Sequence, residues 1–267
     1  MKRLKNFING KFVDSPSDEV LDIVYPVTGE VIAQAPVSTD DDVNTAMHAA
    51  QDAFKTWKHT TPSDRQLLLL KLADALEENV DVLVEAQHRN TGQPRELIRD
   101  EEVLVGANQL RFFAGAARTL EGKAATEYME GHTSYVRREP IGVVAQVTPW
   151  NYPLMMALWK LGPALAAGNT VVLKPSDTTP ESTLELARLI GEIYPAGVVN
   201  VVLGTGETGE AMVGHPAPAM VSITGSVRAG QAVATGAAAG LKRSHLELGG
   251  KAPAVVFADA DLPRTAR

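Results

Sequence analysis

Several polar side chains in the second half of the chain follow short apolar runs that have the character of β-strands. Asn151, Lys174 and Asp177 come after two of these runs, Ser226 comes after a third, and Glu247 lies in a fourth. Ligands of parallel α/β sheets gather beyond the carboxyl ends of the strands, so these side chains are expected to lie near one another. A carboxylate in a buried strand can act as a general base near neutral pH. The spacing therefore predicts acid–base chemistry beside a nucleotide-type ligand.

From Ile141 onward the chain alternates between strand-like and helix-like segments. The predicted strands are Gly142–Val147, Thr170–Leu173, Val198–Leu203, Met220–Ile223 and His245–Leu248. The segments between them are long enough for the crossover helices that parallel strands require, as in Pro153–Ala167 and Glu181–Ile193. The strands are rich in apolar β-branched residues, which indicates burial on both faces. We therefore predict an α/β fold with a doubly wound, Rossmann-like parallel sheet.

The first 140 residues have a different pattern. Asn9-Gly10 and Thr28-Gly29 are hairpin signals within residues 7–37. Four amphipathic helices are predicted next: one after the capping run 38–41, one opened by 61–64, one over 80–90 and one over 95–117. Strand-forming residues on both sides of Gly131 then predict a protruding hairpin over 122–140.

Composition and charge exclude several classes of protein. The 267-residue chain has a formal net charge of −7 and no basic stripe, which argues against a nucleic acid partner. No run of 18 apolar residues occurs, so no membrane span is predicted. Cysteine is absent, and no apolar signal core follows the basic residues 1–5, so a cytoplasmic protein is expected. No metal site is predicted.

One glycine motif, at residues 204–209, resembles a dinucleotide-binding fingerprint. Its sequence, Gly-Thr-Gly-Glu-Thr-Gly, matches G-x-G-x-x-G. The fingerprint belongs to the first strand–helix turn of its fold, whereas this motif follows the third predicted strand. About 20 positions on, where an acidic residue would hold a ribose, the chain has the apolar run Met220–Ile223. We interpret the motif as a glycine-rich loop, while a supporting contact near an adenine by Gly204, Gly206 and Gly209 stays open.

Four ordered motifs resemble the first part of NAD-dependent aldehyde dehydrogenases. They are Thr148-Pro149-Trp150-Asn151, Lys174-Pro175-Ser176-Asp177, Ile223-Thr224-Gly225-Ser226 and Glu247-Leu248-Gly249-Gly250-Lys251. The resemblance extends from roughly Asn6 to Asp261. Within the superfamily the chain is most similar to the bacterial gamma-aminobutyraldehyde dehydrogenases, over stretches such as 111–118, 130–134 and 149–174. The resemblance implies NAD as the cofactor and the oxidation of an aldehyde, 4-aminobutanal in this branch, during polyamine degradation.

The resemblance also implies catalytic roles for three residues. The Asn151 amide would stabilise the oxyanion, Glu247 would activate water as the general base, and Lys160 would have an accessory charge-relay role. The leucines around Glu247 predict its burial. The residues alone leave other interpretations open: a helix cap for Asn151, a lysine paired with a carboxylate for Lys160, and a structural carboxylate for Glu247.

The cofactor contacts implied by the resemblance come from all four motifs and the glycine loop. Lys174 and Asp177 would hold the adenosine ribose, and an acid there repels a 2′-phosphate, which favours NAD over NADP. Many relatives have Glu where this chain has Asp177. Ser226 would contact the pyrophosphate at a helix N-terminus, although plain helix capping is an alternative for both Asp177 and Ser226. The full set of expected cofactor residues is Thr148, Pro149, Trp150, Asn151, Lys174, Ser176, Asp177, Gly204, Gly209, Thr224, Gly225, Ser226 and Leu248.

Three apolar side chains near Asn151 are candidates for substrate binding. Tyr152, Met156 and Trp159 are spaced i, i+4 and i+7, so they would share one helix face. Aromatic faces near a carboxylate would bind the ammonium group of an aminoaldehyde. The candidate carboxylates lie at 100–102. An aromatic stripe in the core is the alternative.

The nucleophile implied by the resemblance is a cysteine about thirty residues beyond Glu247, around position 280, and this chain has none. We therefore expect an N-terminal fragment, inactive by itself, of an enzyme that is a homo-oligomer when complete. We expect residues 1–121 to form the N-terminal part of the NAD-binding domain and residues 122–140 to form an oligomerisation hairpin. Residues 141–250 would form the Rossmann-like core, and residues 251–267 would begin a truncated catalytic domain. The alternatives are a non-catalytic NAD-binding or subunit-pairing protein and the betaine-aldehyde branch.

Overall fold

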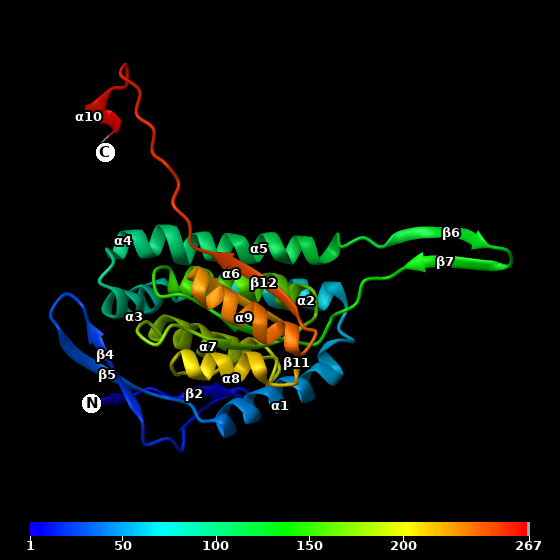
Figure 1. Ribbon diagram of the computed structural model, residues 1–267, viewed down its shortest axis with the longest axis horizontal. Helices are drawn as coiled ribbons and strands as arrows, with labels where there is room; N and C mark the ends of the chain where they lie inside the picture. Colours follow the sequence, from blue (N-terminus) through cyan, green and yellow to red (C-terminus); the bar gives the residue numbers. More distant parts are fainter. Residues whose placement is uncertain (266–267) are drawn as a thin grey trace.

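The computed structural model describes residues 1–265 and is built around a seven-stranded sheet with the order β12-β11-β8-β9-β10-β2-β3 (Figure 1). From β8 to β12 all neighbours run parallel, and the hairpin β2–β3 pairs antiparallel with β10. The five predicted parallel strands are thereby confirmed. The strands of this sheet are β2 (Asn6–Ile8), β3 (Lys11–Val13), β8 (Val143–Val147), β9 (Thr170–Lys174), β10 (Val199–Val201), β11 (Pro218–Gly225) and β12 (Arg243–Leu248).

The strand order explains where a ligand can bind. The first parallel strand, β8, lies in the middle; β9 and β10 extend the sheet on one side, whereas β11 and β12 extend it on the other. The chain therefore reverses direction across the sheet between β8 and β11. In doubly wound sheets such a point opens a crevice beyond the carboxyl ends of the strands. This places the predicted polar side chains around one crevice.

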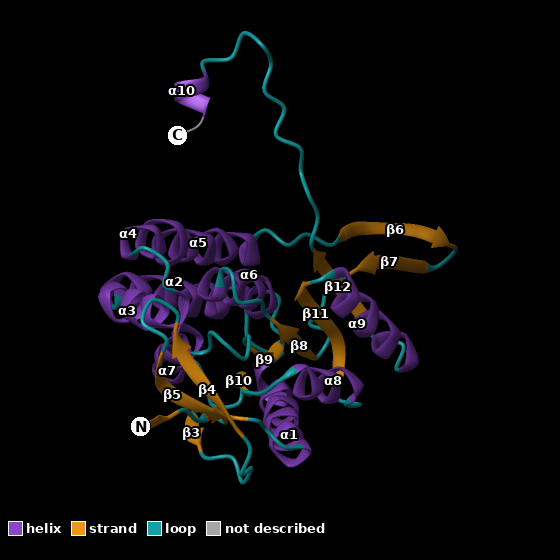
Figure 2. Ribbon diagram, turned by 60° about the vertical axis from the view of Figure 1, so that its left-hand side comes forward, coloured by secondary structure: helices purple, strands orange, loops and turns teal. Residues whose placement is uncertain are grey.

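Helices cover both faces of the sheet (Figure 2). Helices α1, α8 and α9 lie on one face, and α2, α3, α5, α6 and α7 lie on the other. The helices are α1 (Asp40–Trp57), α2 (Pro62–Glu78), α3 (Val80–Thr91), α4 (Arg95–Ile98), α5 (Val105–Arg118), α6 (Pro153–Ala166), α7 (Glu181–Ile193), α8 (Gly206–Gly214), α9 (Val227–Ala239) and α10 (Leu262–Thr265), with a π-helix, η1 (Arg99–Leu104), between α4 and α5.

The central strands are buried on both faces, as the sequence predicts. In β9, Val171 and Leu173 pack into the cluster beneath α6 and α7, while Val172 packs into the cluster beneath α1 and α8. All three are fully buried. Burying a side chain of this size stabilises a fold by about 1.5–3 kcal/mol. The continuous apolar run of β9 therefore stabilises the packing of helices on both faces of the sheet.

The predicted capping runs start two of the helices. The Thr39 hydroxyl accepts from the backbone N–H of Asp42 at 3.2 Å, and the Asp42 carboxylate accepts from the backbone N–H of Thr39 at 2.9 Å. Thr61 and Asp64 form the same reciprocal capping box at the start of α2. These contacts satisfy N–H groups that have no partner within the helix.

The helix predicted over 95–117 is present, but it is not α-helical throughout. Residues Arg99–Leu104 form a π-helix between α4 and α5. This turn contains Glu102, whose carboxylate is buried and bonded to groups of α3 and α6. These long-range bonds have no counterpart in the local amphipathic pattern, which is why the sequence gives no sign of the interruption.

Three peripheral features complete the structure. The hairpin of β6 (Lys123–Met129) and β7 (His132–Val136) projects from the body, as predicted (Figure 1). A small sheet joins β1 (Lys2–Arg3), β5 (Glu30–Pro36) and β4 (Val20–Tyr25). Residues 249–261 extend away from the body and lead to α10. None of the helices within residues 1–265 has the length and apolarity needed to cross a membrane.

Candidate functional site

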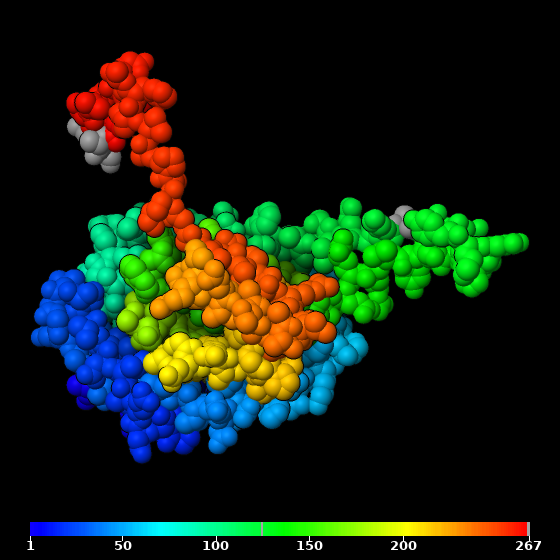
Figure 3. All heavy atoms as spheres, in the orientation of Figure 1, coloured from blue at the N-terminus to red at the C-terminus, as the bar shows by residue number. Residues whose placement is uncertain are grey.

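A cleft of about 820 Å³ opens between α8 and α9, beyond the carboxyl ends of β8, β9 and β11. These two helices lie side by side, and Figure 3 shows them in yellow and orange on the molecular surface. The wall contains four glycines and several apolar side chains, with charged groups only at Lys174, Glu210 and Arg228 among the described lining residues. A mostly apolar cleft with a few polar groups is typical of a small-molecule site.

Lys174 lies at the floor of this cleft, at the end of β9. Its side chain is buried, and its ammonium group donates to the Pro175 carbonyl at 3.0 Å. Burial lowers the pKa of Lys174 to about 8, and the charge of Asp177 partly opposes this effect. Asp177 is exposed and accepts from the Ser176 hydroxyl at 3.2 Å. Helix α7 is capped at Pro180, so the alternative of Asp177 as its N-cap is wrong.

The glycine motif divides into two parts. Gly206 and Gly209 line the cleft, and a Cβ at Gly209 would contact the Lys174 side chain at 3.6 Å. Gly204 has φ +146°, and a Cβ there would lie 2.1 Å from the Thr208 hydroxyl. Gly204 therefore permits close packing and is not among the cleft-lining residues, so its expected cofactor contact finds no support in this position.

The third motif ends β11 and begins α9. The Ser226 hydroxyl caps α9 by accepting from the Ala229 N–H at 3.1 Å. Thr224 and Gly225 pair with Glu247 and Leu248 of β12. The capping interpretation of Ser226 is therefore confirmed as a structural role. It also leaves the positive end of the α9 dipole beside the cleft, where an anion would be stabilised.

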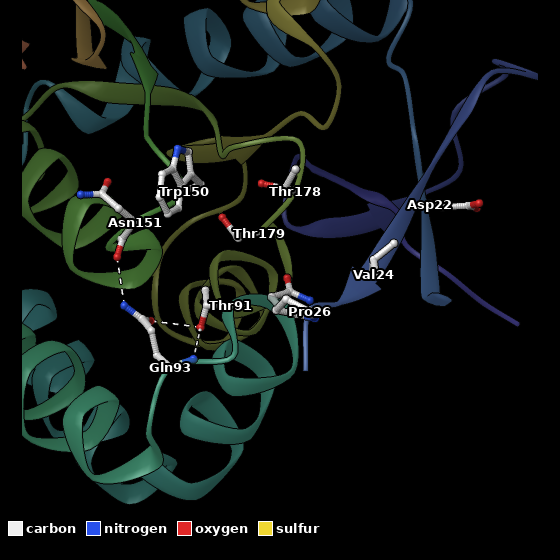
Figure 4. A pocket seen from close by; sticks show the side chains of 10 residues that line it. Asp22, Val24, Pro26, Thr91, Gln93, Trp150, Asn151, Thr178 and Thr179 are labelled. Carbon is white, nitrogen blue, oxygen red and sulfur yellow. Dashed lines mark hydrogen bonds between the residues drawn. The ribbon is translucent and has the colours of Figure 1, made fainter. Parts of the chain in front are cut away.

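The first motif forms the loop between β8 and α6. Thr148 and Pro149 begin this loop; Thr148 is buried and its backbone N–H donates to the Lys174 carbonyl at 3.1 Å, whereas Trp150 is 67% exposed. The Asn151 carbonyl accepts from the Gln93 amide at 3.0 Å. The Asn151 side-chain amide points away from Gln93 and has no hydrogen-bond partner within residues 1–265 (Figure 4). Since α6 is capped at Tyr152, the interpretation of Asn151 as a helix cap is wrong.

A smaller cavity of about 390 Å³ lies on the other side of this loop (Figure 4). Trp150 and Asn151 form part of its wall, opposite Val24 and Pro26 at the end of β4. Gln93 closes the wall between them by its bond to the Asn151 carbonyl. Gln93 thus fixes the backbone of the loop, while the Trp150 side chain remains exposed to solvent.

A buried polar network that sequence reasoning missed holds the start of α6. The backbone N–H of Leu154 donates to Gln87 Oε1 at 3.2 Å, and that of Met155 donates to Glu102 Oε2 at 3.1 Å. Gln87 also donates to Gln93 Oε1 at 2.9 Å. Burial raises the pKa of Glu102. The first turn of α6 is therefore capped from α3 and η1, because Tyr152 itself provides no side-chain cap.

This network corrects one expectation about substrate binding. Glu102 is almost fully buried and is already bonded to Met155 and Gln87, so it is unavailable for an ammonium group. Asp100 and Glu101 are exposed, and Asp100 accepts from Arg99 Nε at 3.1 Å. No local feature of the acidic run 100–102 separates its buried member from its exposed members.

The proposed substrate residues are only partly as predicted. Tyr152 precedes α6, with φ −142°, so it does not share a helix face with Met156 and Trp159. Tyr152 is 38% exposed and Trp159 is 48% exposed, and Met156 is half-buried. The alternative of an aromatic core stripe is therefore wrong. Tyr152, which follows Asn151, and Trp159, about two turns into α6, both remain available at the surface.

Lys160 and Glu247 differ most from the expectations. Lys160 is buried, and its ammonium group donates to the Ser222 hydroxyl at 2.8 Å and forms no ion pair within the described chain. Burial lowers the pKa of Lys160 to about 8, against an opposing effect of the Glu247 charge. Glu247 has a side-chain exposure of 62%, so the predicted burial is wrong. Within residues 1–265, β12 is an edge strand, and its flanking leucines are themselves only partly covered.

Comparisons with known proteins agree with this geometry. The NAD⁺ complex of an aldehyde dehydrogenase from Bacillus cereus is 37% identical over 98% of this chain and 54% of its own length, with a TM-score of 0.93. PnpE from Pseudomonas sp. WBC-3, also solved with nicotinamide adenine dinucleotide, is 42% identical over 98% of this chain and 54% of its own, with a TM-score of 0.93.

A betaine aldehyde dehydrogenase from Staphylococcus aureus, solved with NAD⁺, is 35% identical over 97% of this chain and 53% of its own, with a TM-score of 0.92. The chain therefore spans about half the length of the solved structures that it matches. The sequence model described as the aldehyde dehydrogenase family matches residues 12–267. With almost the whole chain matched, and with the fold of solved relatives, the chain belongs to the aldehyde dehydrogenase family.

Proposed function

We propose that this chain is the cofactor-binding part of an NAD-dependent aldehyde dehydrogenase, and that the whole protein oxidises 4-aminobutanal to 4-aminobutanoate. The observation that carries the proposal is the cleft between α8 and α9, with buried Lys174 at its floor and exposed Asp177 beside it. The free amide of Asn151 follows the adjacent strand. A nucleotide site and an oxyanion donor therefore lie at neighbouring strand ends.

The residues of the cleft fit the adenosine half of NAD. The Lys174 ammonium group can donate to ribose hydroxyls and the Asp177 carboxylate can accept from them, with repulsion of a 2′-phosphate. The N-terminus of α9 at Ser226 suits the pyrophosphate. Gly209 leaves room above Lys174, and Leu248, which is 40% exposed, is free to contact the nicotinamide side. When bound, NAD supplies the acceptor for the hydride.

Residues of this chain would perform two steps around a cysteine thiolate supplied elsewhere in the whole protein. Asn151 donates its amide N–H to the oxyanion formed when the thiolate adds to the aldehyde, a contribution of about 10²–10³ in rate. Glu247 then takes a proton from the water that hydrolyses the thioester. Its exposure in this chain leaves the carboxylate open to that water. The charge of Glu247 acts on Lys160 and partly opposes the effect of burial on the Lys160 pKa.

The aminoaldehyde is favoured by exposed aromatic and acidic side chains at the start of α6, on α6 and on η1, which contacts α6. Tyr152 and Trp159 are partly exposed, and Asp100 and Glu101 are exposed. An ammonium group gains about 0.5–2 kcal/mol over an aromatic face. A quaternary ammonium would gain in the same way, so betaine aldehyde is the second candidate, favoured by the likeness to the Staphylococcus aureus enzyme.

The projecting hairpin is the proposed oligomerisation element of a cytoplasmic enzyme. Tyr128 and Tyr135 are 84% and 73% exposed on β6 and β7. Large aromatic side chains at such positions are typical of interfaces. This supports a homo-oligomer for the whole protein.

Steady-state assays of the whole protein test the proposed activity. We expect NAD-dependent oxidation, a higher kcat/KM for 4-aminobutanal than for betaine aldehyde or butanal, and a loss of about 10²–10³ in kcat for Asn151→Ala. Trp159→Ala should raise KM for 4-aminobutanal by about tenfold and leave butanal unaffected. Equal kcat/KM values for 4-aminobutanal and butanal would contradict the substrate assignment, and full activity of Asn151→Ala would contradict the oxyanion role.

A further inference from the structure

Four polar side chains from three elements form a continuous series of contacts that ends at Glu247. Lys160 Nζ of α6 lies 2.8 Å from Ser222 Oγ of β11. The same oxygen lies 3.0 Å from His245 Nδ1, and His245 Nε2 lies 3.2 Å from Glu247 Oε1. We propose that Ser222 and His245 link Lys160 to Glu247, and that His245 is a positioning residue that orients this carboxylate and passes protons to and from it. The inference rests on the proposed function, because it takes Glu247 as the general base.

The backbone brings these groups together. Ser222 of β11 and His245 of β12 are direct partners in the parallel register. His245 and Glu247 are two residues apart on one strand, so their side chains lie on the same face of the sheet. Lys160 reaches this face from α6, one helix layer above it. The series therefore follows from strand register rather than from the rotamer of one long side chain.

The hydrogen bonds can all run in one direction. A lysine ammonium group only donates, so Ser222 Oγ accepts from Lys160 and offers its own proton to His245 Nδ1. A neutral imidazole that accepts at Nδ1 carries its proton on Nε2, where it faces the Glu247 carboxylate. Lys160 and Ser222 then each donate one hydrogen bond toward Glu247, and His245 Nε2 lies 3.2 Å from its carboxylate, an arrangement that favours the proton on Nε2 of His245.

This arrangement balances as a proton transfer. Nε2–H passes its proton to Glu247, Oγ–H passes one to Nδ1, and Nζ–H passes one to Oγ. The result is a neutral Lys160 amine and a protonated Glu247, and the reverse sequence restores both. No bond between heavy atoms changes and no other reactant is consumed. When Lys160 is the neutral amine, Glu247 can pass the proton that it takes from water to Lys160 by this reverse sequence.

Burial distinguishes this series from a surface ion pair. His245 and Glu247 have side-chain exposures of 50% and 62%, and an isolated pair of this kind contributes about 0–1 kcal/mol. Lys160 and Ser222 are 6% and 5% exposed, however, and the series continues inward through them. Glu247 is also the one charged group that influences the pKa of Lys160 among the described residues. Within residues 1–265 the Lys160 ammonium group has no ion-pair partner, so Glu247 is the negative charge that acts on it.

Nuclear magnetic resonance of the isotope-labelled protein tests the link without catalysis. We expect neutral His245 to carry its proton on Nε2, and the Lys160 amine to titrate near pH 8. Glu247→Gln should lower the Lys160 pKa, and Ser222→Ala should abolish the Nε2–H preference of His245. His59→Gln, at an exposed loop histidine, should change neither signal. A proton on Nδ1 of His245, or an unchanged tautomer in Ser222→Ala, would overturn the proposal.

Kinetics of the whole protein separate this proposal from the proposed function. His245→Gln should lower the rate of thioester hydrolysis by about 10², the lower end for groups involved in proton transfer, and should flatten its pH dependence. The initial burst of NADH should stay unchanged. If Glu247→Gln itself leaves hydrolysis intact, the proposed function of Glu247 fails. If Glu247→Gln slows hydrolysis and His245→Gln leaves its rate and pH profile unchanged, the link alone is refuted.

Discussion

Replacing Lys174 with methionine should stabilise the fold while weakening cofactor binding. Lys174 is buried, its one side-chain hydrogen bond is to the Pro175 carbonyl, and its pKa is lowered from 10.5 to about 8. The ammonium group is therefore retained at neutral pH at a cost to stability. Such a cost is expected of a residue kept for binding rather than for packing.

The size of the expected stabilisation follows from the lowered pKa of Lys174. A difference between 10.5 and about 8, at about 1.4 kcal/mol for each pH unit, corresponds to about 3 kcal/mol of destabilisation at pH 7. Losing the bond to the Pro175 carbonyl costs about 1 kcal/mol. Lys174→Met, which has a similar volume, should therefore raise the free energy of unfolding by about 2 kcal/mol at pH 7. Loss of a charged donor to the ribose should weaken NAD binding by about 1.5–3 kcal/mol, or about 10- to 150-fold in Kd.

The lowered pKa of Lys174 also determines how the stability of the fold changes with pH. Between about pH 8 and 10.5 the unfolded chain binds more protons at this lysine than the folded chain, so stability rises with pH. From pH 7 to pH 9.5 the unmodified protein should regain about 2 kcal/mol from Lys174. The advantage of Lys174→Met should shrink correspondingly.

Urea denaturation at pH 7 and pH 9.5, with calorimetric titration of NAD, measures both effects. Lys58→Met, at an exposed position after α1, is the matched control and should alter stability by less than about 0.5 kcal/mol. A destabilised Lys174→Met variant at pH 7 would refute the burial argument. An unchanged Kd for NAD would refute the assignment of Lys174 to the cofactor.

Four further substitutions test core packing, helix capping and cofactor selectivity. A Cβ at Gly106 would lie 2.3 Å from Leu158 Cδ1 in the core, so Gly106→Ala should lower the free energy of unfolding by about 1–3 kcal/mol in urea denaturation. Gly115 lies in the same helix but faces open space, so Gly115→Ala should raise it by up to about 1 kcal/mol. Glu102→Ala leaves one N–H of Gln87 and the backbone N–H of Met155 unpaired, and should lower the free energy of unfolding by about 2–4 kcal/mol. A decrease below about 0.5 kcal/mol would contradict the capping role of Glu102. Asp177→Ser should narrow the preference for NAD over NADP in calorimetric titrations, and an unchanged ratio would contradict its role.

Much of the fold could be predicted from the sequence because its signals are local. Thr39 and Thr61, each followed three residues later by an acid, begin α1 and α2 as predicted. The boundaries predicted for the second crossover helix agree with α7 (Glu181–Ile193). The parallel strands were recognisable because β-branched runs alternate with helix-length segments, and the central runs that form β8 and β9 are buried on both faces.

The site was less predictable because burial depends on distant parts of the chain. Glu247 is flanked by leucines but lies on an edge strand, so the local pattern overestimates its burial. Glu102 lies in an acidic run that looks solvated, yet it caps a helix that begins about fifty residues later in the sequence. Lys160 was predicted equally well as a relay or as a paired surface lysine, and only the register of β11 and β12 reveals its link to His245.

Calorimetric titration of the purified protein with NAD and NADP tests the central claim most directly, because it needs no catalytic cysteine. The account predicts one NAD for each chain, at least tenfold tighter than NADP, with binding weakened by Lys174→Met. A folded protein that binds neither nucleotide would contradict the assignment of the α8–α9 cleft as the cofactor site. Equal affinity for NAD and NADP would contradict the role given to Asp177.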